Sequence, residues 1–382
     1  MADPPVKMLF VHDAPYIGGS ETVLLDLLSA LNGERFEPVV ATSPRSALIE
    51  SLDRAGVPWR PFELPQMKSF RGLFAAKATA SRLTDLVASE KARLVHTNTV
   101  RAHIAGALSG GRADAPVVWH LHDDTMPRWA FRLLHSRATR ILAASRFIAS
   151  FYRAADLPEC RVVHNGIDPG PSGDAASFRS AHGVPSEAPL VITVSRLTRW
   201  KGHRTFLESA AQVAAHRPDA WFAVVGGHDP EAPNRGDFGG GPEYAAELEK
   251  LAVELGIERR VVFTGHLPQV ADAYSAGDLL VHAPIRPEPF GRVLVEAMAA
   301  GLPVIASRLG GPSEIVVEGE TGRLVEAGTA AAFAAASLEL LDGTDLRRRM
   351  GEAGRRRARE HFDLHAQTRK VEAVFDEALN RV

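Results

Sequence analysis

Two glutamates with seven residues between them form the pattern with the most chemical content in this sequence. Glu288 lies in a Pro-rich turn that ends in Phe290 and Gly291, and Glu296 lies inside an apolar run that stops at Gly301. The pattern predicts a loop for the first carboxylate and a helix for the second. Carboxylates accept hydrogen bonds from sugar hydroxyls, and backbone N–H groups at a helix start face phosphate. The segment therefore predicts a site for an anionic, hydroxyl-rich ligand.

The same pattern also fits an ordinary strand–helix–strand unit whose two glutamates face solvent. Three details favour the ligand site over this alternative. Apolar residues surround Glu296 within its helix. Pro287 and Pro289 stiffen the backbone on either side of Glu288, and Gly291 leaves the helix start open to close approach. A half-buried carboxylate needs partners, which ligand hydroxyls would supply.

Two cations follow the strand that we expect over residues 190–194. Arg196 and Lys201 stand between this strand and the next helix, where two cations can hold a diphosphate and stabilise it as a leaving group. A pair of solvated loop cations is the alternative. Their position directly after a buried strand favours the diphosphate.

Two adjacent glycines, Gly18 and Gly19, follow the first expected strand and precede a helix. Without side chains, their backbone amides can approach a phosphate, and Ser20 or Glu21 can cap or orient the helix. The segment is neither a Gly-x-Gly-x-x-Gly fingerprint nor a P-loop with its Lys-Ser/Thr. A plain glycine turn is the alternative.

Two histidines lie at the end of the strand that we expect over residues 117–120. Side chains alternate along a strand, so His120 and His122 share a face, and either can bond a sugar hydroxyl. A metal site with Asp123 and Asp124 is a rival, but no further ligand set is evident. A histidine that merely ends a strand is the third reading.

Composition limits the possible function classes. A chain of 382 residues with 45% hydrophobic residues is typical of two domains with separate cores. The net charge of −2 provides no global field that would favour nucleic acid as a partner. The single cysteine, Cys160, excludes an internal disulfide and a cysteine metal cluster, and a cytoplasmic location fits best.

No segment approaches the ~18 apolar residues that are needed to cross a bilayer. Peripheral contact at the inner face of a membrane is still compatible with the sequence. Lys68, Arg71, Lys77 and Arg82 alternate with aromatic and aliphatic residues and could form a helix that lies on anionic lipid.

Strand-like and helix-like segments alternate along the chain, which predicts an α/β protein with parallel sheets covered by helices. A polar stretch over residues 168–175 divides the alternation into two similar halves, and a cleft between such halves would bind ligands. The expected strands are 7–12, 38–41, 58–62, 94–96, 117–120, 140–143 and 161–164, then 190–194, 220–225, 260–263, 278–282 and 303–306. The expected helices include 21–31, 71–89, 330–341, 345–360 and 364–381.

Several of these motifs occur together in a fixed order. They are Gly18-Gly19-x-Glu21, His122-Asp123, Asn165-Gly166-Ile167-Asp168, Arg196…Lys201-Gly202, Glu288…Glu296 and Gly310-Gly311…Glu314-Ile315-Val316…Gly319…Thr321-Gly322. In this order the chain resembles glycosyltransferase family 4 (glycosyl transferases group 1), the retaining nucleotide-sugar transferases of GT-B fold. The resemblance covers nearly the whole chain and is most specific over residues 190–325.

The resemblance implies two Rossmann-like domains that face each other across a cleft. Residues 1–169 would bind the acceptor, and residues 170–361 would bind the nucleotide-sugar donor. The helix 362–382 would pack back on the first domain. Substrate binding would close the cleft.

The resemblance also implies roles in the second half. Glu296 would bond the ribose of the donor, and Glu288 would bond its sugar near the 3- and 4-hydroxyls. Arg196 and Lys201 would take the charge of the diphosphate, so that no divalent metal and no other cofactor is required. Sugar and phosphate would also meet the backbone of Phe290, Gly291, Arg292, Val293 and Leu294.

Five further residues have implied roles. Gly18 and Gly19 would approach the donor phosphates from the first half, and His122 would touch the 6-hydroxyl of the sugar. His266 and Leu267 sit where relatives place the base, and they leave uracil and guanine as alternatives.

We therefore expect a retaining, metal-independent hexosyltransferase that uses a UDP- or GDP-sugar and the hydroxyl of a sugar, lipid-linked or small-molecule acceptor. A nucleotide-sugar epimerase or hydrolase on the same fold is the nearest rival. A dinucleotide-dependent oxidoreductase is disfavoured because neither half has Gly-x-Gly-x-x-Gly with an acid about 20 residues on. A non-catalytic sugar-nucleotide binder is the last rival.

Overall fold

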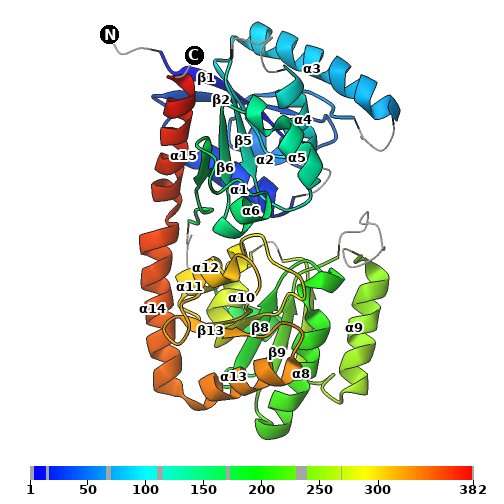
Figure 1. Cartoon of the computed structure of the whole chain (residues 1–382). Coiled ribbons are helices and arrows are strands. Elements are labelled where there is room, and N and C mark those ends of the chain that lie inside the picture. The colour runs from blue at the N-terminus through cyan, green and yellow to red at the C-terminus, as the bar shows by residue number, and fades with distance from the viewer. Residues whose placement is uncertain are drawn as a thin grey trace. The chain divides into compact units, whose positions relative to one another are not determined.

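The computed structural model describes residues 4–13, 17–65, 70–109, 115–168, 173–228, 239–267 and 269–380. The chain divides into two compact units, of which unit 1 comprises residues 1–168 and 363–382 and unit 2 comprises residues 169–362. Each unit is a parallel β-sheet with helices on both faces (Figure 1). The expected linker 168–175 includes residues 169–172, which lie outside the described residues.

The described part of unit 1 has one sheet of seven parallel strands in the order β3-β2-β1-β4-β5-β6-β7. The strands are β1 (Val6–Val11), β2 (Phe36–Thr42), β3 (Trp59–Pro61), β4 (Leu94–Thr97), β5 (Val117–Leu121), β6 (Arg140–Ala143) and β7 (Cys160–Val162). All strands predicted for this half are confirmed, with ends that differ by at most two residues. Buried strands of this kind are apolar throughout, which is why the sequence reveals them.

Helices cover both faces of this sheet because successive strand residues point to opposite sides. Leu9 and Val11 pack in one core with α3, α4, α5 and α6, and Met8 and Phe10 pack in another with α1, α2 and α15. The helices are α1 (Gly19–Ala30), α2 (Ile49–Arg54), α3 (Phe70–Glu90), α4 (Val100–Ser109), α5 (Arg128–Leu134), α6 (Arg146–Phe151) and α15 (Leu364–Leu379).

The C-terminal helix α15 belongs to unit 1, although it is far from the other elements of this unit in sequence (Figure 1). It packs against α1 and against β4, β5 and β6. The ring of Phe375 lies edge-on to those of Phe10 and Phe36, at centroid distances of 6.3 and 5.9 Å. The cover of this face of the sheet is therefore completed only when the end of the chain is in place.

Unit 2 has, in its described part, one sheet of six parallel strands in the order β10-β9-β8-β11-β12-β13. The strands are β8 (Leu190–Val194), β9 (Trp221–Val225), β10 (Val261–Gly265), β11 (Leu279–His282), β12 (Val304–Ser307) and β13 (Gly322–Val325). The helices are α7 (Ala175–Ala181), α8 (His203–His216), α9 (Pro242–Glu254), α10 (Ala271–Ala276), α11 (Arg292–Ala300), α12 (Pro312–Ile315), α13 (Ala330–Asp342) and α14 (Thr344–Phe362).

Strand β13 was not among the predicted strands. It is short, begins at a glycine and contains Arg323, so it lacks the continuous apolar run of a buried strand. Its pairing with β12 decides its structure. A Cβ atom at Gly322 would lie 2.1 Å from the carbonyl oxygen of Val304, so only glycine allows this close approach.

The helices of the described residues include none that is both long and apolar enough to cross a membrane. Of the four cations in the predicted membrane segment, Lys68 and the side chain of Arg71 lie outside the described part. Arg82 donates to the carbonyl oxygen of Glu63 and covers the ring of Phe62 at 5.6 Å. This cation therefore packs on its own domain.

Candidate functional site

The strand order reverses between β8 and β11 in unit 2 and between β1 and β4 in unit 1. Ligands of open parallel sheets bind outside the carboxyl ends of the strands at such a reversal. In unit 2 the loop after β8 carries Arg196 and Lys201, and the loop after β11 carries Glu288. The topology alone thus brings both charged loops to the same edge of the sheet.

A glycine allows these two loops to touch. Gly202 has a left-handed φ of 75°, and a Cβ atom there would lie 1.7 Å from the carbonyl oxygen of Ala283. The amide of Ile285 donates to the carbonyl oxygen of Trp200 at 2.9 Å, which ties the loops together. Any side chain at residue 202 would force the loops apart.

Lys201, His282 and Glu288 form what we call the carboxylate cluster. The Nζ atom of Lys201 lies 2.6 Å from Oε2 of Glu288, and Nε2 of His282 lies 3.1 Å from the same oxygen. An ionised carboxylate only accepts hydrogen bonds, so the His282 ring donates through Nε2. Both donors share one oxygen, and the carboxylate is held in a single orientation between the two strand ends.

Burial and charge act in opposite directions on this cluster. Burial by itself would raise the pKa of Glu288, but the charge of Lys201 and the bonds from His282 and Lys201 lower this pKa to about 2. Burial lowers the pKa of His282, against the effect of the carboxylate. At neutral pH the cluster is therefore a carboxylate, an ammonium and a neutral imidazole.

The backbone of Glu288 is fixed by the Gly310-Gly311 segment. The amide of Gly311 donates to the carbonyl oxygen of Glu288 at 2.8 Å. Gly310 has a φ of 74°, and a Cβ atom there would lie 2.4 Å from the same oxygen. This contact gives a physical reason for adjacent glycines after β12.

Helix α11 positions the second carboxylate. It begins after Gly291, whose φ is 102°. Tyr274 donates its hydroxyl to Oε2 of Glu296 at 2.7 Å, and Nε of Arg292 lies 2.9 Å from Oε1. Glu296 is thus half-exposed and held by two partners.

The segment 290–294 contains further residues that are predicted to contact the donor. The side chains of Phe290 and Leu294 are buried in the core, so these residues can present only their backbone to a ligand. Val293 is half-buried. The backbone role expected for these residues stays a prediction.

Arg196 and the predicted base-binding turn lie along the same sheet edge. Arg196 is exposed, and the next residue, Leu197, donates its amide to the carbonyl oxygen of Gly227 at 3.0 Å. A Cβ atom at Gly227 would lie 3.0 Å from the amide of His266, so the turn with His266 and Leu267 borders this loop. The loops that follow β8, β9 and β10 therefore lie next to one another along this edge of the sheet.

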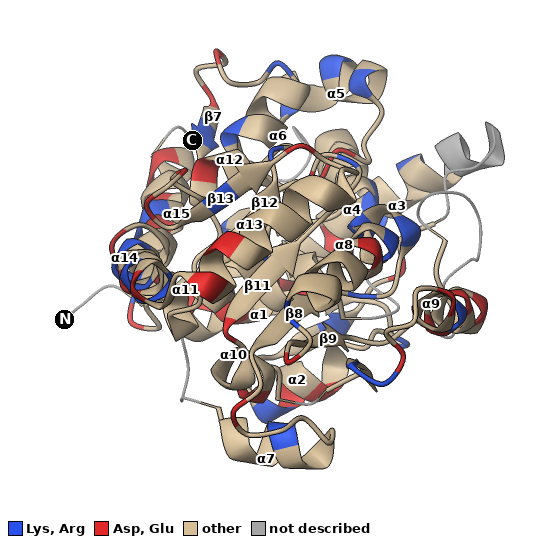
Figure 2. Ribbon diagram, turned by 90° about the horizontal axis from the view of Figure 1, so that it is seen from below, with Lys and Arg blue, Asp and Glu red and all other residues tan. Residues whose placement is uncertain are grey.

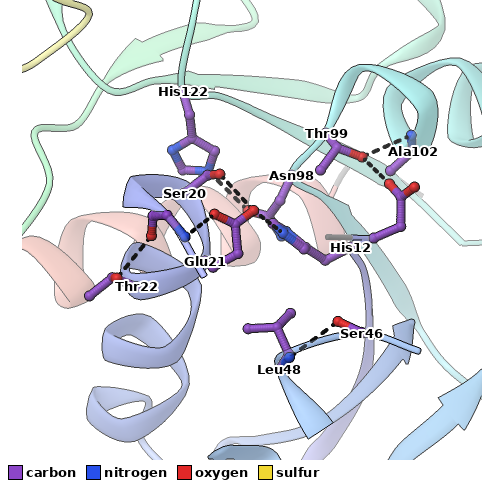
Figure 3. A network of polar contacts seen from close by, with 12 residues as sticks. His12, Ser20, Glu21, Thr22, Ser46, Leu48, Asn98, Thr99, Ala102 and His122 are labelled. Atoms are coloured by element: carbon purple, nitrogen blue, oxygen red, sulfur yellow. Dashed lines mark hydrogen bonds and ion pairs between the residues drawn. The ribbon is translucent and has the colours of Figure 1, made fainter. Parts of the chain in front are cut away.

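In unit 1 the glycine turn is held by a buried glutamate (Figure 3). Oε1 of Glu21 lies 2.8 Å from Nε2 of His12 and accepts from the Ser20 hydroxyl, while Oε2 accepts from the amide of Gly18. Burial would raise the pKa of Glu21, but the bond to His12 and its charge lower it to about 2. The predicted capping role of Glu21 is confirmed. A Cβ atom at Gly19 would meet nothing within 4 Å, so folding does not require glycine there.

The histidines at the end of β5, of which His120 is buried and His122 half-buried, belong to a second network, which includes Asn98 (Figure 3). Nε2 of His122 lies 3.1 Å from Oδ1 of Asn98, whose Nδ2 lies 3.1 Å from Nδ1 of His96. The rings of His120 and His122 have centroids 4.1 Å apart, which confirms that they share a face. We call His96, His120 and His122 the histidine cluster.

Among the described residues, the side chains at this strand end do not form the ligand set that the metal alternative requires. Asp123 accepts through Oδ1 from the amide and the hydroxyl of Thr125. Throughout the described ranges, no group of three or more His, Cys, Asp or Glu side chains is arranged to hold a metal ion.

The histidine cluster predicts acid-sensitive folding. Burial lowers the pKa of His122 to about 3, whereas an unfolded histidine titrates near 6.5. The unfolded chain binds more protons between these values, so stability is complete above pH 6.5 and is lost as the pH falls. At pH 5 we expect a loss of about 2 kcal/mol for this one histidine.

Urea titrations at several pH values measure this loss. The variant His122→Gln should flatten the pH dependence, whereas His216→Gln, at an exposed position of α8, should leave it unchanged. If the free energy of unfolding of His122→Gln falls with pH as steeply as that of the unchanged chain, this explanation is wrong.

Sequence reasoning missed five residues of these networks: His12, His96, Asn98, Tyr274 and His282. Four of them share a signal, because each is a polar residue near or just after the carboxyl end of a buried strand. Tyr274 carries no such signal. Only the packing of α10 beside α11 brings it to Glu296.

Two family models match consecutive parts of the chain. A model described as glycosyltransferase family 4 matches residues 17–170, and one described as glycosyl transferases group 1 matches residues 174–357. The chain belongs to glycosyltransferase family 4. Its two parallel-sheet units are those of the GT-B glycosyltransferase structures.

Named relatives support the same family. The chain is 32% identical to a D-inositol 3-phosphate glycosyltransferase of Streptomyces coelicolor over 69% of this chain and 65% of the relative. It is 28% identical to the sulfoquinovosyl transferase of Arabidopsis thaliana over 97% of this chain and 73% of the relative. The matches to the D-inositol 3-phosphate glycosyltransferases span about half to two thirds of their length, for example 53% for that of Corynebacterium glutamicum.

Solved structures resemble nearly the whole chain. HepE of Anabaena, in complex with UDP and glucose, has a TM-score of 0.83 and 26% identity, over 97% of this chain and 99% of HepE. A glycosyltransferase of Rickettsia africae has a TM-score of 0.87 at 22% identity, over 99% of this chain and all of that protein, which shows the fold alone.

Proposed function

We propose that this family 4 protein transfers a hexosyl group from a nucleotide-diphosphate sugar, UDP- or GDP-linked, to an acceptor hydroxyl, with retention of configuration and without a metal. The observation that carries the proposal is the 2.6 Å pair of Lys201 and Glu288 at the reversal between β8 and β11. At this reversal, a cation that can bind the diphosphate lies beside a carboxylate that can bind the sugar. HepE, which is similar over its whole length, was crystallised with UDP-glucose, and this supports a UDP-sugar donor.

In the proposed reaction the bond between the sugar C1 and the diphosphate oxygen breaks, and a bond between C1 and the acceptor oxygen forms on the same face. The acceptor proton passes to the leaving diphosphate. Lys201 and Arg196 stabilise the charge of the diphosphate, and Glu288 orients the sugar through its hydroxyls. Glu296 bonds the ribose, and the acceptor hydroxyl belongs to a sugar, a lipid-linked group or a small molecule.

Unit 2 binds the donor in this proposal, and unit 1 binds the acceptor. Gly19 supports the involvement of unit 1, because the fold leaves open space where its side chain would be. His122 would meet the 6-hydroxyl of the sugar. Burial keeps its imidazole neutral at pH 7, so it can act there as a hydrogen-bonding group rather than as a cation.

Thermal-shift measurements with UDP, GDP and their glucose conjugates test donor binding. A nucleotide at 100 times its dissociation constant stabilises the folded chain by about 2.7 kcal/mol. We expect one of the two bases to raise the melting temperature and the matching nucleoside monophosphate to raise it less, because Lys201 and Arg196 would lack a full diphosphate. The absence of a shift with every diphosphate would contradict the proposal.

Product analysis separates transfer from the rival reactions. The selected donor is incubated with and without a mixture of acceptors, and the release of nucleotide diphosphate is followed. Release that depends on acceptor identifies a transferase, and equal release without acceptor identifies a hydrolase. Conversion of the sugar without release of nucleotide would identify an epimerase.

A further inference from the structure

Helix α5 of unit 1 exposes two large apolar side chains to solvent. Trp129 is 70% exposed and Leu133 is 67% exposed. They are four residues apart, so they lie side by side on one face of the helix. They are the two most exposed of the large hydrophobic side chains in the described part of the chain.

The fold itself makes no use of this pair. The opposite face of α5 packs in the core through Ala130, Phe131 and Leu134, and the ring of Phe131 stacks on that of Tyr152 at 4.9 Å. The helix is therefore apolar on two faces.

Cations surround the exposed pair. Arg128, Arg132 and Arg137 are exposed, and residues 128–137 contain no acidic side chain. Figure 2 shows Lys/Arg positions and no Asp/Glu position on α5. Arg128 covers the ring of Phe151 at 4.2 Å, which anchors its stem on the protein and leaves the guanidinium at the surface.

Two acidic side chains of the neighbouring loops are engaged with other residues. Asp123 accepts from Thr125, and Glu159 lies 3.3 Å from Nδ1 of His135. The surface formed by Arg128, Trp129, Arg132, Leu133 and Arg137, which we call the α5 face, therefore combines an apolar centre with positive charge.

We propose that the α5 face docks on the surface of an anionic lipid bilayer. Trp129 and Leu133 enter the boundary between headgroups and acyl chains, where indole rings are favoured, and the three arginines contact lipid phosphates. A protein partner fits less well, because a stable interface needs about 800 Å² from each partner and the helix has only seven residues. Anionic lipid carries the charge that is complementary to the arginines, and we therefore choose it as the partner of the α5 face.

Co-sedimentation of the full chain with vesicles tests this proposal. We expect binding to vesicles of phosphatidylcholine and phosphatidylglycerol at low salt, and weak binding to pure phosphatidylcholine. The variant Trp129→Ser/Leu133→Ser should bind the anionic vesicles about tenfold less or weaker still. Arg128→Gln/Arg132→Gln should lose on the order of tenfold on the anionic vesicles only. Circular dichroism confirms that each variant is folded.

Two controls make the test specific. Val253→Ser removes another exposed apolar side chain, 61% exposed on α9, and should not change binding. Lys77→Gln removes a cation of α3 and should change it little. The proposal is overturned if the chain does not bind at low salt, if Trp129→Ser/Leu133→Ser binds equally, or if Lys77→Gln has the larger effect. It is also overturned if Leu133→Glu abolishes self-association in sedimentation velocity, since the α5 face would then join two copies.

Discussion

Glu288→Gln is expected to lower sugar transfer on the order of 100-fold. The amide keeps the size of the carboxylate and can still accept one bond from His282, but it can no longer balance the charge of Lys201 or accept from two sugar hydroxyls at full strength. The loss should appear mainly in kcat, because the sugar is misoriented rather than unbound. Steady-state assays with the donor selected by thermal shift measure it.

The same variant should also change acid stability. The pKa of Glu288 is lowered to about 2 in the folded chain, from an ordinary value of 4.5. The ionised pair therefore stabilises the fold fully above pH 4.5, and this contribution disappears as the pH falls through 2. The shift corresponds to a stabilisation on the order of 3 kcal/mol at neutral pH.

Glu249→Gln is the matched control for both measurements. Glu249 is exposed on α9 of the same unit, so its replacement should change neither transfer nor the acid branch of the unfolding curve. Near-normal turnover of Glu288→Gln would remove Glu288 from the proposed site. If Glu288→Gln loses stability at acid pH just as the unchanged chain does, the pair of Lys201 and Glu288 does not stabilise the fold.

Lys201→Ala should reduce transfer by more than tenfold and weaken the binding of diphosphates more than that of nucleosides. The Nζ atom is the charged donor nearest to Glu288, and its loss removes a charge that the departing diphosphate needs. It also leaves Glu288 buried without a cation, so we expect the pKa of that carboxyl to rise and the fold to lose stability.

Arg199→Ala is the control for Lys201→Ala. Arg199 lies in the same short turn, but it forms two 2.7 Å bonds to Glu247 at the surface of α9. Its removal should leave turnover intact. The double variant Lys201→Ala/Glu288→Gln should recover part of the stability lost in Lys201→Ala, because the unpaired buried charge is gone. Additive losses would show that the two side chains act independently.

Most of the fold could be predicted because buried parallel strands are short apolar runs between turn residues. Strands β6 and β8 agree with their predicted ends, and the C-terminal helix has its predicted start at Leu364. The failure to predict strand β13 has a physical cause. The segment Gly322–Val325 has no apolar run of its own and becomes a strand only through its hydrogen bonds to β12.

The candidate site was predictable to a smaller extent. Glu288, Lys201 and the glycine turn are visible because unusual residue types stand after buried strands. Their contacts were not visible. Lys201 and Glu288 are 87 residues apart, and no local rule relates residues at this separation. In the sequence His282 is only the last residue of a predicted strand, and the tertiary structure places its ring beside the carboxylate.

The amino-acid order by itself determined the alternation of strands and helices, the division into two α/β halves and the charged residues at strand ends, because these follow from local periodicity and turn chemistry. The tertiary structure decided which of those residues touch. The strand order 10-9-8-11-12-13 and the close approach at Gly202 and Gly310 bring an ammonium and an imidazole to one oxygen of Glu288. Burial then makes this contact strong, since charges removed from water interact in a medium of low dielectric constant.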